Sequence, residues 1–212
     1  MTSRMSGPIQ GSGVRPALCQ AMAQLLHWPR PAAATARLLG DLAPTEAAML
    51  AAIPAADVAM VTLAIPAVDW PERLRGMSGY LVPKPVQRLV TATSFGSQEW
   101  AHWAVDGSVV LRISLGRDGL PVLHLSDEQL LRAATDEVGQ HLGVSLQPTH
   151  SRVSRWAGAF PQYRPHHAQR VAEIEAGLPA GLKLAGASYH GIGVPACIRS
   201  AQNAAAALHA RD

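Results

Sequence analysis

A glycine-rich stretch near the C-terminus contains the residue types best suited to holding a ligand. Residues 181–203 read GLKLAGASYHGIGVPACIRSAQN. The apolar segment Leu182 to Ala185 predicts a short strand, and Gly186 predicts the turn that ends it. A loop with two further glycines, Gly191 and Gly193, follows. Because glycine has no side chain, the backbone of such a loop can approach a ligand closely.

A helix is predicted directly after this loop. Pro195 stands where a first helical residue belongs, and the apolar and alanine residues beyond it continue to about Leu208. The free N–H groups and the dipole at a helix N-terminus favour an anionic or electron-rich ligand. The stretch therefore predicts a ligand site, and a tight strand-to-helix connection that binds nothing is the alternative.

The order of residue types in this stretch resembles a known family. It is similar to the C-terminal flavin-contacting segment of the oxygen-dependent protoporphyrinogen and coproporphyrinogen oxidases, which belong to the flavin amine oxidase superfamily. Further blocks follow in the family's order, so that the resemblance covers about residues 29–209. These blocks are PAAATARLL, DLAP, VAMVTLAI, GYLVP, TATSFGSQEW, VVLRISLGR, LSDEQLL and RWAGAFPQY. The resemblance implies FAD as cofactor and a porphyrinogen as substrate, oxidised by O2 to the porphyrin in haem biosynthesis.

The resemblance also assigns residues to the cofactor and the substrate. The residues that match the flavin-contacting motif are Gly186, Tyr189, Gly191, Gly193, Val194, Ala196 and Cys197. Gln162 and Tyr163, in the PQY block, would lie beside the flavin. Arg112 could meet substrate propionates from the polar face of its strand, although a solvent-facing arginine is the alternative. No side chain is assigned to catalysis itself, because the flavin performs the oxidation.

One part of the family pattern is missing from the chain. Family members open with a βαβ unit carrying G-x-G-x-x-G, which binds the FAD pyrophosphate. Gly11-Ser12-Gly13 is the candidate here, but no apolar strand precedes it and no acidic residue follows at the expected distance. We therefore expect a truncated form with an unmatched start (1–28), a substrate-binding-type domain (29–160) and a flavin-contacting segment (161–212). Such a chain should bind FAD weakly and be inactive alone.

Two other functions remain open at this point. The chain could be a non-catalytic remnant, or a subunit that pairs with a separate FAD-binding chain or with copies of itself. It could also be another flavin amine oxidase, acting on amines or carotenoids, although the LVP and SFGSQEW blocks favour the porphyrinogen branch. The residues do not separate protoporphyrinogen from coproporphyrinogen as the substrate.

The hydrophobic pattern predicts an α+β fold. Val58 to Ile65 is apolar on both faces and predicts a central strand covered on both sides. Val109 to Leu115 alternates and predicts a half-buried antiparallel strand. Ser126 to Leu142 predicts a helix with a capping box, and a second helix is predicted from Pro165 or His166 to Leu178. We expect an antiparallel or mixed sheet with helices on one face, followed by the C-terminal strand, loop and helix.

Composition restricts the class of partner and the location. The net charge is only +3 and the arginines are scattered, which argues against nucleic acid. Cys19 and Cys197 do not form a disulfide framework, so reduced thiols in a cytoplasmic protein are expected. No signal peptide is visible, and the longest apolar run is far below the ~20 residues needed to span a bilayer. Peripheral membrane contact is neither required nor excluded, since substrates of the resembled family are apolar.

Two further groups of polar residues are interpreted as structural. The histidines at 150, 166, 167 and 190 lack the spacing of zinc ligands, so no metal is predicted and a surface or loop position is expected. The pair Asp136-Glu137 is expected on a solvated helix face, because neighbouring helical side chains diverge and cannot act as a catalytic pair.

Overall fold

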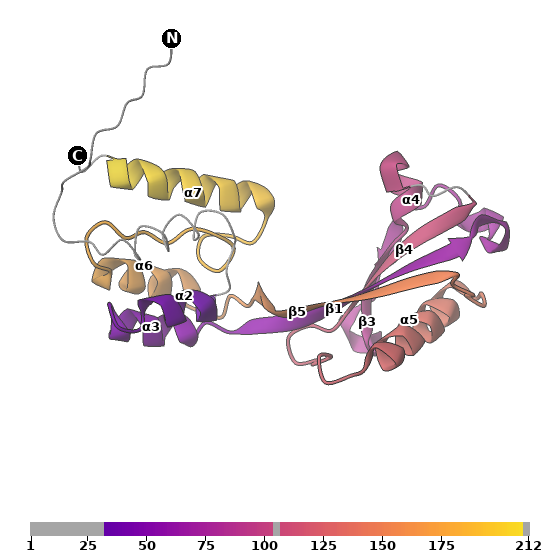
Figure 1. The fold of residues 1–212 in the computed structure, drawn as a ribbon, viewed down its shortest axis with the longest axis horizontal. Helices are drawn as coiled ribbons and strands as arrows, with labels where there is room; N and C mark the ends of the chain where they lie inside the picture. Colours follow the sequence, from indigo (N-terminus) through magenta and orange to yellow (C-terminus); the bar gives the residue numbers. More distant parts are fainter. Residues whose placement is uncertain (1–31, 104–106, 210–212) are drawn as a thin grey trace, which may run out of the picture.

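The computed structural model describes residues 32–103 and 107–209. It consists of two lobes joined by two long strands (Figure 1). The helices are α2 (Ala32–Leu39), α3 (Pro44–Ala51), α4 (Gly96–Glu99), α5 (Asp127–Leu142), α6 (His167–Gly177) and α7 (Val194–His209). The strands are β1 (Ala55–Pro66), β2 (Gly79–Leu81), β3 (Val90–Ser94), β4 (Ser108–Leu115) and β5 (His150–Pro161). Short 3-10 turns lie at Ala67–Asp69, Glu72–Leu74, Lys84–Val86 and Ala101–Trp103.

The five strands form one antiparallel sheet in the order β2-β3-β4-β1-β5. The predicted α+β class is confirmed, and β1 is central because it pairs with β4 on one side and β5 on the other. The expectation that β1 is covered on both faces is wrong. Ala59, Val61 and Leu63 are buried, whereas Met60 and Thr62 between them are only half-buried. Among the described residues, the long helix on the sheet covers the face that carries Ala59, Val61 and Leu63.

The helix that covers this face is α5 (Figure 1). Leu130, Ala134 and Val138 of α5 pack on the buried side chains of β1 and β4. The predicted capping box is present: the N–H of Gln129 donates to Ser126 Oγ, and the N–H of Ser126 donates to Gln129 Oε1. Gly143 ends the helix with a left-handed φ of 62°. β4 alternates as predicted, which places Arg112 on the face opposite α5.

The prediction of a solvated Asp136-Glu137 pair is wrong for Glu137. Its side chain is buried, with 5% of the residue exposed. The carboxylate accepts hydrogen bonds from the N–H groups of Leu89, at 3.2 Å, and Val90, at 3.0 Å. Val90 is the first residue of β3, and Leu89 directly precedes it. Glu137 therefore joins α5 to the start of β3, and only Asp136 is exposed.

The second lobe is helical and has its own core. Side chains from α2 and α3 pack with Val171 and Ile174 of α6, and with Leu184 and Tyr189 of the following loop. Residues from the predicted 29–160 segment thus share a core with residues from the predicted 161–212 segment. The inner face of α2 is formed by Ala32, Thr35, Ala36 and Leu39, whereas Leu38 is 46% exposed.

The segment Leu182 to Ala185, predicted as a strand, is irregular, and this prediction is wrong. A strand requires a hydrogen-bonded neighbour, and no described strand pairs with this segment. The helix after it is confirmed as α7, with Pro195 in its first turn. None of the helices within 32–103 and 107–209 combines the length and apolarity that a bilayer-crossing helix requires. Cys19, Pro31, residues 1–28 and Gly11-Ser12-Gly13 lie outside the described residues.

Candidate functional site

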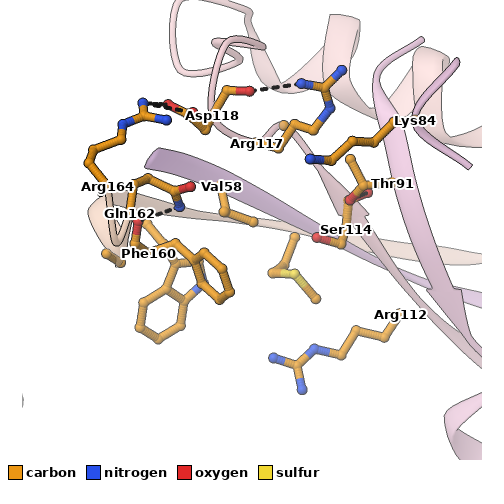
Figure 2. Close-up of a pocket in the computed structure, with 14 residues that line it drawn as sticks. Val58, Lys84, Thr91, Arg112, Ser114, Arg117, Asp118, Phe160, Gln162 and Arg164 are labelled. Carbon is orange, nitrogen blue, oxygen red and sulfur yellow. Dashed lines mark hydrogen bonds and ion pairs between the residues drawn. The ribbon is translucent and has the colours of Figure 1, made fainter. Parts of the chain in front are cut away.

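The face of the sheet opposite α5 bears a cavity of about 750 Å³ (Figure 2). This size falls within the usual range of small-molecule sites. Its apolar surface comes from Val58, Met60, Trp156, Ala159 and Phe160. An adjoining hollow of about 440 Å³ shares Met60, Arg112 and Trp156 with it. A groove therefore runs across β4, β1 and β5.

Arg112 and Arg152 lie in one row across this groove. Arg112 of β4 and Arg152 of β5 both pair in register with Thr62 of β1. Strands lie about 4.8 Å apart, so the two arginine backbones are about 10 Å apart on one face. The guanidinium carbon of Arg112 lies 5.9 Å from the centre of the Trp103 ring. Among the described residues, no carboxylate lies within ion-pair distance of Arg112 or Arg152.

The Arg164 guanidinium at the rim is already neutralised. Arg164 pairs with Asp118, with one nitrogen 3.0 Å and 2.8 Å from the two carboxylate oxygens. Arg117 instead donates to neutral acceptors, the side chain of Gln87 and the carbonyl of Asp118. Figure 2 shows Arg117 and Lys84 on one side of the cavity and Arg112 on another. The groove is thus apolar in its middle and cationic at separate places around its rim.

The segment after β5 connects this cavity to the glycine loop. Gln162 and Arg164 line the cavity, whereas Tyr163 between them points to the loop. The Tyr163 hydroxyl accepts the N–H of Gly191 at 2.8 Å and donates to the carbonyl of Ala187 at 2.7 Å. Of the two PQY residues predicted to lie beside the flavin, Gln162 therefore faces the sheet cavity and Tyr163 holds the loop.

His167 lies beneath Tyr163. The two rings stack with centroids 3.7 Å apart and planes at 14°. Only 9% of His167 is exposed, and its Nε2 has no hydrogen-bond partner. Burial lowers the pKa of His167 and raises the pKa of the Tyr163 hydroxyl. The surface position expected for this histidine is wrong, because α6 turns it into the helical lobe. Within the described residues, no three His, Cys, Asp or Glu side chains gather as a metal site would require.

The glycines of the loop have different roles. Gly186 and Gly191 have φ values of 119° and 120°, which side chains rarely adopt, and a Cβ on Gly191 would lie 2.7 Å from that of Ala196. The N–H of Gly186 donates to the buried Ser200 hydroxyl of α7 at 3.1 Å. A Cβ on Gly193, in contrast, would meet nothing closer than 3.8 Å. The fold therefore constrains Gly191 and leaves Gly193 free to face a ligand.

Tyr189 is separated from the other predicted cofactor residues. It is 4% exposed and its hydroxyl donates to Thr35 Oγ1 at 2.8 Å, inside the core of the helical lobe. Burial raises the pKa of this hydroxyl. The side chain is thus unavailable to a cofactor, and the predicted contact would have to come from the backbone. Cys197 is half-buried, with its thiol 3.7 Å from the carbonyls of Gly191 and Ile192.

The start of α7 suits an electron-rich ligand. The first N–H groups of a helix have no acceptor within it, and Gly193 and Val194 are exposed at this end. Ala196 is half-buried against Gly191. This helix N-terminus would therefore favour an electron-rich group such as a flavin ring. The described residues do not include a glycine-rich βαβ unit that could hold a pyrophosphate.

Sequence reasoning missed several cavity residues. Lys84, Arg117, Arg152, Trp156 and Phe160 were not among the predicted site residues, although they line the groove. The sequence did contain a signal for Arg152 and Trp156. Arg152, Ser154 and Trp156 alternate along β5, and side chains two apart share one face of a strand. The pairing of that face with Arg112 could not be read from the sequence.

The fold and these sites define a class of protein. The chain belongs to the family of flavin containing amine oxidoreductases, whose pattern matches residues 29–209. Among curated relatives, the coproporphyrinogen III oxidase of Mycobacterium tuberculosis H37Rv is 41% identical over 188 residues, covering 87% of this chain and 40% of the relative. The protoporphyrinogen oxidase of Bos taurus is 32% identical over 187 residues, covering 83% of this chain and 38% of the relative.

A solved structure agrees with this assignment. A provisionally assigned protoporphyrinogen oxidase from Exiguobacterium sp. 255-15 superposes with a TM-score of 0.72 at 28% identity, covering 86% of this chain and 40% of that one. The chain spans about 40% of the length of these two curated relatives.

Proposed function

We propose that this chain provides the substrate-binding face and the flavin-ring edge of a flavin-dependent oxidase of porphyrin biosynthesis. Its substrate would be coproporphyrinogen or protoporphyrinogen, and its cofactor FAD. The observation that carries the proposal is the segment 160–164. Phe160, Gln162 and Arg164 line the cavity, while Tyr163 holds the loop that ends at the exposed start of α7.

The sheet-face cavity suits a porphyrinogen chemically. A porphyrinogen is a large apolar ring system with carboxylates on its periphery. The apolar middle of the groove would take the rings by burying their surface against Met60 and Trp156. Arg112, which has no carboxylate partner among the described residues, would pair with a propionate. Desolvation by the ligand would strengthen this pairing.

The start of α7 would hold the flavin ring. If FAD bound there, it would supply the oxidation, taking hydride equivalents from the methylene bridges and passing the electrons to O2. The exposed backbone around Gly193 and Val194 would approach the ring, and the helix dipole would favour negative charge on it. Tyr163 would position this backbone through Gly191 without contacting the reacting atoms. The segment 160–164 would thus help to position both the substrate and the cofactor.

Equilibrium binding of coproporphyrin III tests the substrate part of the proposal. Tryptophan fluorescence is suited to this measurement because Trp156 lines the cavity. We expect saturable quenching, and Arg112→Met should weaken binding about three- to tenfold, as expected for one charged contact. Arg132→Met is the matched control, because Arg132 is exposed on α5 behind the sheet. Absence of saturable binding, or equal effects of both variants, would overturn the proposed site.

Flavin binding separates the proposal from its alternative. The chain is mixed with excess FAD, passed through a gel-filtration column and scanned for the visible absorption of oxidised flavin. Aerobic turnover of both porphyrinogens is followed by porphyrin fluorescence in parallel. Retained flavin with turnover above the autoxidation blank would support a complete oxidase. A colourless chain that still binds porphyrin would support a substrate-binding subunit that requires a separate FAD-binding chain.

A further inference from the structure

We infer that Lys84 and Arg117 form a second carboxylate-binding end of the sheet-face cavity, which selects porphyrinogens carrying carboxylates on opposite edges of the ring. This inference rests on the proposed function and goes beyond it, because it names residues that choose between the two candidate substrates. The first end is the row that contains Arg112 and Arg152.

The two ends lie apart along the groove. Arg117 follows the end of β4, five residues beyond Arg112. At about 3.3 Å per residue, the last residue of β4, Leu115, is about 10 Å from Arg112 along the strand, and Arg117 follows it. Lys84, from the turn between β2 and β3, lines the same cavity, and Figure 2 shows it near Arg117 and away from Arg112. Ser114 and Thr91 line the cavity between the two ends, beside the apolar Met60.

The positive charge at the second end is not compensated by described carboxylates. Neither Lys84 nor Arg117 has a described carboxylate within 4 Å, and the one acidic residue lining the cavity, Asp118, is paired with Arg164. The contacts of Arg117 are the Gln87 side chain, at 2.6 Å, and the Asp118 carbonyl, at 2.8 Å. These neutral acceptors orient the guanidinium without cancelling its charge, so it remains able to attract an anion.

The segment before β3, which carries Lys84, is held by the buried carboxylate of Glu137 on the α5 side of the sheet. Glu137 of α5 accepts the N–H groups of Leu89 and Val90. The carbonyl of Leu89 in turn accepts the N–H of Gly116, next to Arg117, at 3.0 Å. Gln87 completes the arrangement, because its amide donates to the Val82 carbonyl and its oxygen accepts from Arg117. The cationic end is thus built into the sheet edge rather than carried on a free loop.

The two candidate substrates differ in the positions of their propionates, which two separate cationic ends can distinguish. Protoporphyrinogen has two propionates on neighbouring pyrrole rings, so both lie on one edge of the ring system. Coproporphyrinogen has a propionate on each of its four rings, so carboxylates lie on opposite edges. With one edge at Arg112 and Arg152, only the second substrate presents carboxylates to Lys84 and Arg117.

The test is a comparison of two porphyrins on the full 212-residue chain. Coproporphyrin III carries four propionates, and deuteroporphyrin IX carries two on neighbouring rings. Lys84→Met should weaken coproporphyrin III binding about three- to tenfold and leave deuteroporphyrin IX binding within about twofold. The side chain of Lys84 is exposed, so its substitution should leave the fold unchanged. Arg117→Gln should act in the same direction, while Arg112→Met should weaken both porphyrins.

Arg88→Met is the matched control, since Arg88 is exposed in the same segment but does not line the cavity. It should leave both affinities unchanged. If Lys84→Met changes both porphyrins equally, or changes neither while Arg112→Met weakens both, the second end is overturned and the proposed site stands. If the unsubstituted chain binds neither porphyrin, the proposed function and this inference are both overturned.

Discussion

The hydroxyl of Tyr163 accepts a hydrogen bond from the backbone N–H of Gly191, 28 residues further along the chain, at 2.8 Å. The same hydroxyl donates to the carbonyl of Ala187 at 2.7 Å. One side chain beside the sheet cavity therefore closes the loop that leads to the start of α7. The position of the proposed flavin edge relative to the proposed substrate face depends on this contact.

Tyr163→Phe should loosen the loop without disturbing the rest of the fold. The stacking on His167 is retained, but one donor and one acceptor are lost, which should cost about 1 kcal/mol in the free energy of unfolding. Hydrogen exchange of the Gly191 amide should rise well above that of amides in β1. Unchanged protection of Gly191 would show that another group holds the loop.

Acidification should destabilise the chain partly through His167. Burial lowers its pKa in the folded chain. Below about pH 6.5, His167 therefore binds a proton more readily in the unfolded chain than in the folded chain. This contribution to stability is present above pH 6.5 and is lost as the pH falls toward the lowered pKa. His167→Phe, which keeps an aromatic ring under Tyr163, should therefore reduce the loss of stability between about pH 7 and pH 5.

Denaturation midpoints at several pH values measure this effect. His124→Phe is a suitable control, since His124 is exposed. Equal pH dependence in the unsubstituted chain and in His167→Phe would mean that the histidine titrates freely in the fold.

Substitution of Glu137 should lower the free energy of unfolding, although the sequence pattern predicts a solvent-exposed position for this residue. Glu137→Ala leaves the amides of Leu89 and Val90 without their acceptor in a buried place, which should cost about 1–3 kcal/mol. Glu137→Gln keeps one acceptor oxygen and should cost less. Urea denaturation of the two variants, with exposed Asp136→Ala as control, measures the order. Equal midpoints for Glu137→Ala and Asp136→Ala would contradict the buried role.

The cap of α5 offers a second stability prediction. Ser126→Ala removes the acceptor of the Gln129 amide and should lower the free energy of unfolding by about 1 kcal/mol. Ser126→Asn, which can still cap, should retain most of the stability. A denaturation midpoint for Ser126→Ala equal to that of the unsubstituted chain, at equal slope, would place the beginning of the helix elsewhere.

The two loop glycines should respond differently to the same substitution. Gly191→Ala forces a side chain into an unfavourable φ and against Ala196, so it should destabilise the fold by about 1–3 kcal/mol. A Cβ on Gly193 would meet only Pro195, at an ordinary contact distance of 3.8 Å, so Gly193→Ala should change stability by less than about 0.5 kcal/mol. Thermal unfolding of both variants checks this. A large loss for Gly193→Ala would show that Gly193 is constrained by the fold and not by a ligand.

Local features of the chain could be predicted from the sequence because their partners are close in it. The capping box of Ser126 and Gln129, the left-handed Gly143 and the alternation of β4 depend on contacts or periods spanning a few residues. The resemblance located the loop before α7 for the same reason, since its glycines and Pro195 form one continuous motif. These signals determined the α+β class and the candidate flavin edge.

The tertiary structure decided the features whose partners are distant in the chain. The sequence pattern does not distinguish Glu137 from an exposed helical carboxylate, and only the packing of α5 brings it to the Val90 amide at the start of β3. Tyr189 belongs to the predicted flavin motif by sequence, but in the structure its hydroxyl bonds to Thr35, 154 residues away. Leu182 to Ala185 has the composition of a strand, but a strand forms only where a neighbour pairs with it. The cavity likewise exists because β4, β1 and β5 bring Arg112, Met60 and Trp156 to one face, a register that only the assembled sheet fixes.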